Sequence, residues 1–547
     1  MKMKKFKIVI LSVLILVFVS GFAFVTDKYF EISKNIDLFS KVYKEISFNY
    51  VEDIDPALFM RAGIEGMLNS LDPYTTFIDE NKKEDYDLLT TGKYGGVGVS
   101  IGIRGDKVTI TEVFDGYSSQ RQGIRVGDIL IEAANTKITP ENIDMISSLV
   151  KGLPGTTVNI KVFRNEQKDT LSFNLVREEV IVKTLLYAGF YPANSNNVYL
   201  KLSNFSRSAS DEIRTALKDL QEIKDIKSII LDLRNNPGGL LDVAVNICDD
   251  FLPKDNLIVS TLAREKTDEK KYYSLHDPII ENAKIVLLIN GNTASASEIV
   301  SGALQDHDKA VIVGTKSFGK GLVQTITPLS YNTSLKITTA KYFTPSGRSI
   351  QRIDYTKNNK VIAVPDSIFK SSYKTDNNRI VFSGGGINPD TTINSNKLSE
   401  ITISLLAKGL FFTFADRYYY ANKDLKFDKL NDVLLINEFK KYLVEQKFNF
   451  KFKSGEDLAN LISSLDNKTG YKSITSKLNN IKLEMEDLQK SEIDNNKKEI
   501  LDQLKSELAS RYIGTKGRNE ELLKNDNQFQ FAFDLTKNTE LYNKLLH

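Results

Sequence analysis

Three short segments carry side chains that could do chemistry, and the first contains a serine with two possible roles. Segment 291–298 reads GNTASASE and follows an apolar run typical of a buried strand. Ser295 and Glu298 have the spacing of a capping box, which would only stabilise the start of a helix. A serine on such a strand-to-helix turn could instead be a nucleophile, with helix N–H groups facing a developing oxyanion. Ala294 and Ala296 would leave room for a substrate around it.

The second segment, 314–321, reads GTKSFGKG and places a lysine between two glycines. Lys320 is either an exposed loop lysine or a general base that replaces histidine in a Ser-Lys dyad. Its ordinary pKa near 10.4 leaves roughly one molecule in a few thousand neutral at pH 7. Burial lowers that pKa, and Phe318 and Leu322 could form apolar walls. Gln324 could hold the amine through its side-chain oxygen.

The third segment, 232–239, reads DLRNNPGG and lies between an apolar strand and a helix. It is either a glycine-rich turn or a loop whose backbone N–H groups supply half of an oxyanion hole. It matches neither the GxxxxGK[ST] nor the GxGxxG pattern, so nucleotide binding is disfavoured. All three segments leave strand ends in one α/β region, where such sheets bind ligands.

The scarcity of histidine and cysteine limits the possible chemistry. The 547 residues include three histidines and a single cysteine, Cys248. One cysteine excludes an internal disulfide and a CxxC metal site, and so few histidines argue against a His-rich metal centre. A Ser-His-Asp arrangement would need His276, in a predicted loop, or His307, near the end of a predicted helix. A lysine base is therefore favoured.

The net charge of +3 comes from the N-terminus, where four lysines lie in the first seven residues (Lys2, Lys4, Lys5 and Lys7). Without them, 69 basic side chains stand against 70 acidic ones, so no basic surface indicates nucleic-acid binding.

Residues 8–25 read IVILSVLILVFVSGFAFV and carry no charge, at the lower length limit of a membrane span. The lysines before them should stay cytoplasmic, which places everything after Thr26 across the membrane. We expect a retained anchor at 1–25. The alternative is a signal peptide cut near residues 21–23. Either way, the bulk of the protein is expected to be exported, on the periplasmic side of the cell envelope.

The remaining chain is predicted to form a multidomain α/β protein in four parts. The ranges are 26–91 (helical), 92–178 (short strands and turns around a small core), 179–399 (alternating strands and helices) and 400–547 (mostly amphipathic helices). In 179–399, the apolar runs predict strands at 198–200, 227–233, 284–289 and 310–314, with helices at 208–224, 240–251 and 297–306. Near-continuous apolar strands predict a sheet that is buried on both faces.

The combination of motifs resembles the C-terminal processing (tail-specific) serine peptidases of the carboxyl-terminal protease family. The matching stretches are LDPYTTFID (71–79), LDLRNNPGGLL (231–241), NTASASEIVSGALQDH (292–307), GTKSFGKGLVQ (314–324) and TTAKYFTPSGRSI (338–350). The resemblance covers about residues 35–395. It implies a catalytic core with a ClpP/crotonase-like fold at 179–399, a PDZ domain inserted at 92–178, and no cofactor or metal.

The resemblance also assigns roles to individual residues. Ser295 would be the nucleophile, Lys320 the general base and Gln324 its orienting partner. The oxyanion donors would be the backbone of Ala296 and of Gly238 or Gly239, and the sequence does not decide between the two glycines. The PDZ carboxylate-binding loop would be Tyr94, Gly95, Gly96, Val97, Gly98 and Val99, where backbone N–H groups capture a peptide C-terminus.

The resemblance therefore implies an exported endopeptidase that binds protein tails with free, apolar C-termini and cleaves through an acyl-enzyme. It also implies a homodimer, with 26–70 and 400–547 as candidate surfaces for the dimer or for an adaptor. The alternative function is a catalytically silent scaffold whose PDZ domain only captures tails.

Overall fold

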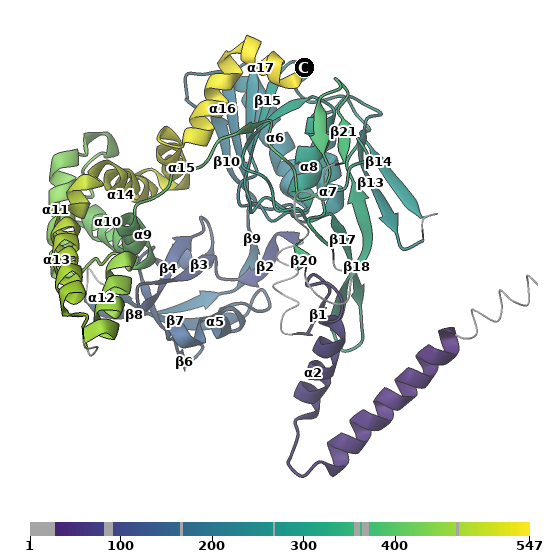
Figure 1. The fold of residues 1–547 in the computed structure, drawn as a ribbon, viewed down its shortest axis with the longest axis horizontal. Helices are drawn as coiled ribbons and strands as arrows, with labels where there is room; N and C mark the ends of the chain where they lie inside the picture. The colour runs from purple at the N-terminus through teal and green to yellow at the C-terminus, as the bar shows by residue number, and fades with distance from the viewer. Residues whose placement is uncertain are drawn as a thin grey trace, which may run out of the picture.

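The chain folds into a multidomain α/β structure, and Figure 1 shows the arrangement of its parts. The computed structural model describes residues 28–80, 91–164, 168–265, 268–354, 362–363, 371–466 and 470–547. The predicted membrane segment 8–25 lies outside these residues. Among the helices of the described ranges, none is long and apolar enough to span a bilayer.

Two helices form an N-terminal hairpin that projects from the rest of the molecule (Figure 1). They cover residues 28–49 and α2 (Pro56–Leu68). Tyr43 stacks on Phe59 between them, with 5.6 Å between ring centroids. The carboxylate of Asp55 caps α2 by accepting two backbone N–H groups of its first turn.

A β-rich domain follows the hairpin and buries a core of its own, as predicted. Its main sheet has the order β3-β4-β5-β7-β8, so β3 is an edge strand. The elements are β3 (Val99–Arg104), β4 (Lys107–Val113), α4 (Ser118–Gln122), β5 (Ile129–Ala133), β6 (Thr136–Lys137), α5 (Ile143–Val150), β7 (Thr157–Arg164) and β8 (Asp169–Val176). Ile110, Leu130 and Ile160 lie buried at its centre.

The glycine-rich segment at the start of this domain differs from the predicted loop. Lys93–Gly96 forms strand β2, which pairs antiparallel with β9 (Glu178–Ile181) and leaves a two-residue turn before β3. Gly95 is required in this strand because a Cβ atom there would lie 2.0 Å from the carbonyl oxygen of Gly152. The sequence indicated a loop because glycine is depleted in strands.

The central sheet of the larger domain has the order β10-β11-β12-β15-β16-β23 and is parallel except for β10. Its strands are β10 (Leu185–Phe190), β11 (Asn197–Leu202), β12 (Ser228–Asp232), β15 (Lys284–Ile289), β16 (Ala310–Gly314) and β23 (Thr391–Thr392). Helices α6 (Ala209–Ile223), α7 (Leu241–Asp249) and α8 (Ala296–Asp306) cover one face, where Ile229 and Leu231 point.

The other face of this sheet is covered by the C-terminus of the chain. Phe529 on α16 (Asn527–Lys537) and Tyr542 on α17 (Thr539–Leu546) pack with Ile230 of β12. The predicted burial of both faces is therefore confirmed, because alternate residues of β12 enter different clusters.

A second sheet lies beside the central one, in the order β1-β18-β13-β14, with β17 also paired to β18. Its strands are β1 (Thr76–Ile78), β13 (Leu257–Ala263), β14 (Glu269–Tyr273), β17 (Leu322–Pro328) and β18 (Ser334–Phe343). Short hairpins join β19 (Ile353–Asp354) to β20 (Ile362–Ala363) and β21 (Ser372–Lys374) to β22 (Ile380–Phe382). Through β1, the N-terminal segment becomes part of this sheet.

The amphipathic pattern after residue 400 corresponds to a helical domain, as predicted. Its helices are α9 (Glu400–Ala407), α10 (Leu410–Ala421), α11 (Asp432–Glu445), α12 (Lys453–Asp466), α13 (Lys472–Asn495), α14 (Lys497–Tyr512) and α15 (Gly514–Lys524). Phe414, Phe439 and Leu504 belong to its buried core. Figure 1 shows this domain beside the β-rich domain, with α15 leading back to the central sheet.

Candidate active site

The turn between β15 and α8 holds Ser295 in a strained backbone conformation, with φ 56° and ψ −117°. Residues other than glycine rarely adopt this conformation, and such strain is concentrated at functional sites. The turn is fixed by Thr293, whose hydroxyl donates to the carbonyl oxygen of Leu233 at 2.8 Å. Ser295 therefore lies half-buried at the N-terminus of α8, on a sharp strand-to-helix turn of the kind that can expose a nucleophile.

A single buried carboxylate joins this turn to the loop that carries Lys320. Glu298 is fully buried, and its Oε2 accepts the N–H groups of Ser295 at 2.9 Å and Lys320 at 2.8 Å. Its Oε1 accepts the N–H of Gly319 at 2.7 Å and the hydroxyl of Ser317 at 2.5 Å. Burial raises the pKa of Glu298 to about 7. The capping contact from Ser295 N–H is present, so capping and chemistry are compatible roles for this pair.

Lys320 lies between β16 and β17, with its Nζ 4.6 Å from the ring centroid of Tyr74. Burial lowers the pKa of Lys320 to about 8, and the positive charge of Lys336 acts in the same direction. Of the two predicted walls, Leu322 is buried but Phe318 is 39% exposed. The aromatic wall is Tyr74, which no local pattern indicated because it comes from the distant segment before β1.

Tyr342 of β18 forms a second link between the two loops. Its hydroxyl lies 3.2 Å from the carbonyl oxygen of Ser295 and 2.5 Å from that of Lys320. Its side chain is buried, and burial raises its pKa well above the ordinary value. No sequence pattern indicated this role, since a tyrosine in a predicted strand is usually a packing residue.

Gln324 lies on β17, close to a bulge in its pairing with β18. Its side-chain nitrogen donates to the carbonyl oxygen of Leu322 at 3.4 Å and to Oγ1 of Thr338 at 3.3 Å. Among the described residues, Gln324 makes no hydrogen bond to Lys320. The predicted orienting contact is therefore not formed in this conformation.

The glycine pair after β12 lies against the Ser295 turn. A Cβ atom on Gly238 would lie 2.6 Å from the carbonyl oxygen of Ala294 and 2.8 Å from the nitrogen of Ala296. The Gly238 N–H already donates to Oδ1 of Asn236 at 2.9 Å. Within the ranges that the structure describes, the N–H groups of Gly239 and Ala296 donate to no protein acceptor. Of the predicted oxyanion donors, these two therefore have an N–H group that is available to a ligand in the part of the chain that the structure describes.

Both internal histidines are engaged away from the Ser295 turn. Nδ1 of His276 lies 2.7 Å from Asp249, and Nδ1 of His307 lies 2.8 Å from Asp376. His307 also contacts the carbonyl oxygen of Leu257 through Nε2 at 2.7 Å. Neither is in position to take a proton from Ser295.

In the β-rich domain, the turn between β2 and the edge strand β3 has free donors. The carbonyl oxygen of Val97 accepts from the N–H of Ser119 at 3.1 Å, and that of Gly98 accepts from the N–H of Phe114 at 2.9 Å. In the described part of the chain, the N–H groups of Val97 and Gly98 donate to no protein group. Tyr94, Gly95 and Gly96 belong instead to the ladder with β9.

Comparison with known proteins identifies each of these regions. Residues 196–361 match the description "Peptidase family S41", residues 95–175 match "PDZ domain", and residues 401–536 match "Probable PDZ-protease, C-terminal helical domain". The chain thus combines a peptidase domain, a PDZ domain and the helical domain of PDZ-proteases.

Two relatives agree with this assignment in their sequences. The carboxy-terminal-processing protease of Bartonella bacilliformis is 35% identical over 326 residues, which span 59% of this chain and 74% of that protein. The carboxy-terminal processing protease CtpB of Bacillus subtilis is 29% identical over 327 residues, 59% of this chain and 67% of the relative. Among solved structures, the photosystem II D1 C-terminal processing protease is 23% identical and covers 65% of this chain and 92% of its own, with a TM-score of 0.35. This chain belongs to peptidase family S41, the carboxy-terminal processing proteases.

Proposed function

We propose that this chain is a serine endopeptidase in which Ser295 is the nucleophile and Lys320 the general base. The observation that carries the proposal is the buried Glu298 carboxylate, which binds the backbone N–H groups of both residues. It fixes a strained serine and a lysine of lowered pKa in one site. A lysine with a pKa of about 8 is neutral in a useful fraction of molecules near neutral pH.

The proposed reaction proceeds through an acyl-enzyme. Oγ of Ser295 attacks the peptide carbonyl carbon while its proton passes to Nζ of Lys320. The tetrahedral intermediate collapses as Lys320 donates that proton to the leaving amine, which leaves an ester on Ser295. A water molecule then attacks the ester while Lys320 accepts its proton. The bond between the acyl carbon and Oγ breaks, the new carboxylic acid leaves, and Lys320 returns the proton to Oγ of Ser295. For Gln324 to hold the amine, its side chain would have to turn from Thr338 toward Nζ.

The N–H groups of Gly239 and Ala296 are the proposed oxyanion donors. Gly238 is the weaker candidate of the glycine pair because its N–H is already bonded to Asn236. Its role would be steric, since only a residue without Cβ can lie this close to the Ser295 turn.

The PDZ domain is proposed to capture the C-terminal tail of a protein substrate. The free N–H groups of Val97 and Gly98 would bind the terminal carboxylate, and the peptide would extend the sheet at the edge strand β3. Peptide or protein binding follows from the PDZ assignment itself, whereas the preference for apolar tails is part of the proposal.

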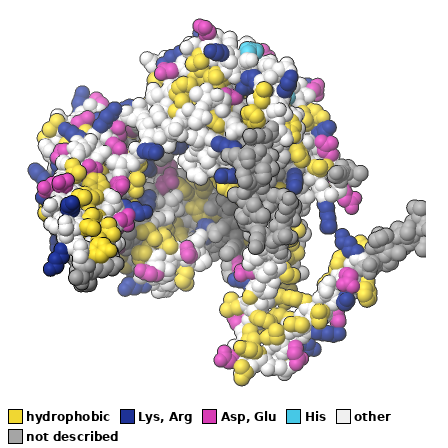
Figure 2. All heavy atoms as spheres, viewed as in Figure 1, with side chains coloured by type: hydrophobic (Ala, Val, Ile, Leu, Met, Phe, Trp, Pro, Cys, Tyr) yellow, Lys and Arg dark blue, Asp and Glu magenta, His cyan; other side chains and the backbone are white. Residues whose placement is uncertain are grey.

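We further propose that the protein is exported and acts as a homodimer, with an adaptor as an additional partner. The N-terminal hairpin supports the dimer, because it exposes large apolar side chains that gather on one part of the surface (Figure 2). Tyr29, Phe30, Ile36 and Leu58 are each more than 60% exposed. Such patches are typical of interaction sites. Export and membrane attachment through residues 8–25 would be tested by fractionating cells that express the full chain and a form lacking those residues.

The central test is cleavage of a folded reporter that ends in a free apolar tail. We expect Ser295→Ala and Lys320→Ala to lose activity while both still bind the tail. An amidated tail should lower the efficiency of the wild type by raising KM. If either variant cleaves at the wild-type rate, the Ser-Lys mechanism is wrong. If the wild type binds tails and cleaves none, the chain is the silent scaffold.

A further inference from the structure

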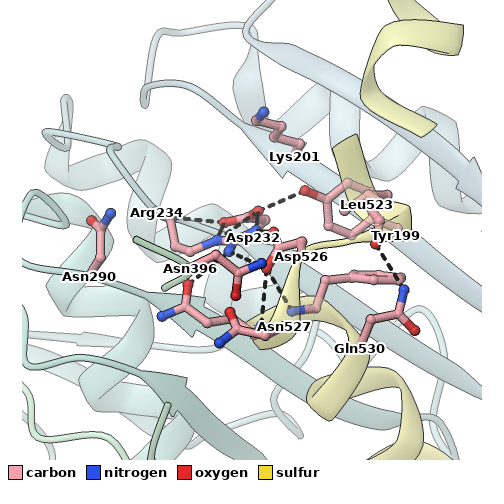
Figure 3. A network of polar contacts seen from close by, with 12 residues as sticks. Tyr199, Lys201, Asp232, Arg234, Asn290, Asn396, Leu523, Asp526, Asn527 and Gln530 are labelled. Atoms are coloured by element: carbon pink, nitrogen blue, oxygen red, sulfur yellow. Dashed lines mark hydrogen bonds and ion pairs between the residues drawn. The ribbon is translucent and has the colours of Figure 1, made fainter. Parts of the chain in front are cut away.

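One arginine joins the candidate oxyanion loop to the C-terminal helix α16, and Figure 3 shows the network around it. Arg234 directly precedes the loop 235–239. Its Nη1 donates to Oδ1 of Asp526 at 3.0 Å and to Oε1 of Gln528 at 2.8 Å, and its Nη2 lies 2.6 Å from Oδ2 of Asp526. The Arg234 side chain is only 14% exposed, so these contacts are little screened by solvent.

Asp526 is not needed to neutralise Arg234. The buried carboxylate of Asp232 already pairs with it, through Nη2 at 2.6 Å and Nε at 2.9 Å. Asp232 also accepts the hydroxyl of Tyr199 at 2.7 Å. Although burial opposes it, the charge of Arg234 holds the pKa of Asp232 below its ordinary value. The carboxylate of Asp526 therefore serves to orient the Arg234 side chain, because its charge is already balanced by Asp232.

The residues after Arg234 connect it to the Ser295 turn. Asn235 has a φ of 60°, and its N–H donates to Oδ1 of Asn290 at 3.0 Å. The carbonyl oxygen of Asn236 accepts the N–H of Ala294 at 3.0 Å and the hydroxyl of Ser297 at 3.1 Å. Asn235 and Asn236 thus connect the loop to the Ser295 turn by hydrogen bonds, and Arg234 connects the start of the loop to α16.

Helix α16 provides a firm anchor for this contact. Oδ1 of Asp526 caps the helix by accepting the N–H groups of Gln528 at 3.0 Å and Phe529 at 3.1 Å. Phe529 is fully buried, and its ring meets that of Tyr199 edge-on at 5.2 Å. Gln528 also donates to the carbonyl oxygen of Ile393 at 2.6 Å. The carboxylate that faces Arg234 is therefore held by the packing of α16 on the sheet.

We propose that Asp526 is a positioning residue for the peptidase reaction: through Arg234 it fixes the loop that presents the Gly239 N–H to the oxyanion. The inference rests on the proposed function of that loop. Oxyanion donors act through accurate placement, and small displacements lower the rate of the chemical step more than they weaken substrate binding. Helix α16 then contributes to catalysis by positioning the loop 235–239, although it does not contact the substrate.

The test compares Asp526→Asn with two other substitutions on the same helix. Asparagine keeps a capping oxygen and the shape of the side chain but removes the charge that faces Arg234. We expect kcat to fall about tenfold with KM within about twofold of the wild type. Asp534→Asn is the matched control, because Asp534 pairs with Lys537 on the exposed side of α16 and should leave kcat unchanged. Leu535→Ala removes packing on the buried side of the helix. It should lower Tm clearly while kcat falls only slightly.

Two further measurements separate positioning from a general loss of stability. The affinity of a peptide boronate, which forms a tetrahedral adduct with a serine nucleophile, should fall in Asp526→Asn in parallel with kcat. Arg234→Lys should lower kcat similarly, and adding Asp526→Asn to it should cause little further loss, because both act through one link. Asp526→Ser, which also caps helices, replaces Asp526→Asn if that variant is unfolded at the assay temperature.

An unchanged kcat in Asp526→Asn would overturn the inference. So would a fall in kcat that is no larger than the fall in Leu535→Ala at a similar decrease in Tm. Ser295→Ala is measured alongside. If it remains active, the proposed function itself is wrong. If it is inactive while Asp526→Asn keeps the wild-type kcat, only the role of Asp526 is refuted.

Discussion

At the scale of single residues, the surroundings of Lys320 decide whether an amine can act as a base near neutral pH. Burial and the charge of Lys336 lower its pKa, whereas Asp72 and Glu298 act in the opposite direction. The result is a pKa of about 8, so the efficiency of cleavage should rise with pH through this region as Lys320 loses its proton. The balance can be tested by removing one of the charges.

Replacement of Lys336 by methionine should raise the pKa of Lys320, because the like charge that disfavours the ammonium is lost. The rising part of the pH profile of kcat/KM should then move to higher pH, and kcat/KM at pH 7 should fall by about threefold. Lys341→Met is the matched control, since Lys341 is exposed on the same strand. A profile that stays in place or moves to lower pH in Lys336→Met would contradict the assignment of Lys320 as the base.

Glu298 offers the second test at this scale. Glutamine would replace one carboxylate oxygen by an NH2 group, although all four partners of Glu298 are donors. Two buried donors would lose their acceptor, which should destabilise the protein by about 2–5 kcal/mol. Because the Ser295 turn and the Lys320 loop separate, kcat should fall by about 100-fold. Ser317→Ala removes one donor to Glu298 and leaves one buried N–H, that of Ile387, without its acceptor. It should therefore cost less than Glu298→Gln in both unfolding and kinetic measurements, and equal effects would argue against the link.

At the scale of elements, the sequence predicted the central sheet and its helices because long apolar runs admit little else. The predicted strands 284–289 and 310–314 coincide with β15 and β16, and the predicted helix 297–306 with α8. Ser295, Lys320 and the glycine pair could be proposed for the same reason, since they follow the predicted strands that correspond to β15, β16 and β12. Their short sequence motifs could be recognised without knowledge of the fold.

What the sequence could not show are contacts between segments that are distant along the chain. Strand β1 has three residues and is defined only by its pairing with β18, so the approach of Tyr74 to Lys320 had no local signal. The sequence predicted amphipathic helices over 400–547, but it did not show that α16 and α17 cover the second face of the sheet. The same holds for the contact between Asp526 and Arg234.

The packing of the glycine loop on the α8 turn leads to a prediction at this scale. Gly238→Ala would place a methyl group 2.6 Å from the carbonyl oxygen of Ala294, at a φ of 96° that alanine avoids. The turn must shift, so kcat should fall by about 100-fold or more while tail binding to the PDZ domain stays unchanged. Gly66→Ala, where no atom lies within 4 Å of the new methyl, should keep full activity. A fully active Gly238→Ala enzyme would show that the loop does not constrain the turn.

At the scale of the whole molecule, the C-terminal segment contacts both the PDZ domain and the catalytic sheet. Phe412 of α10 lies between Arg104 of the PDZ domain, 5.2 Å from its ring centroid, and Arg511 of α14, at 4.3 Å. Arg125 of the PDZ domain lies over Tyr420 at 5.6 Å. The same segment ends in the helices that cover the catalytic sheet. The C-terminal segment therefore contacts the PDZ domain at one end and the catalytic sheet at the other.

This arrangement should raise the effective concentration of a bound tail at the active site, and loosening it should lower that concentration. We expect Arg104→Ala to leave the Kd of a short tail peptide unchanged, because β3 keeps its pairing with β4. For a long substrate that must reach from the PDZ domain to Ser295, KM should rise by about three- to tenfold. Lys107→Ala, an exposed position on the other strand of the same hairpin, is the control and should behave as the wild type. If Arg104→Ala cleaves long substrates with an unchanged KM, the helical segment does not set the position of the PDZ domain during catalysis.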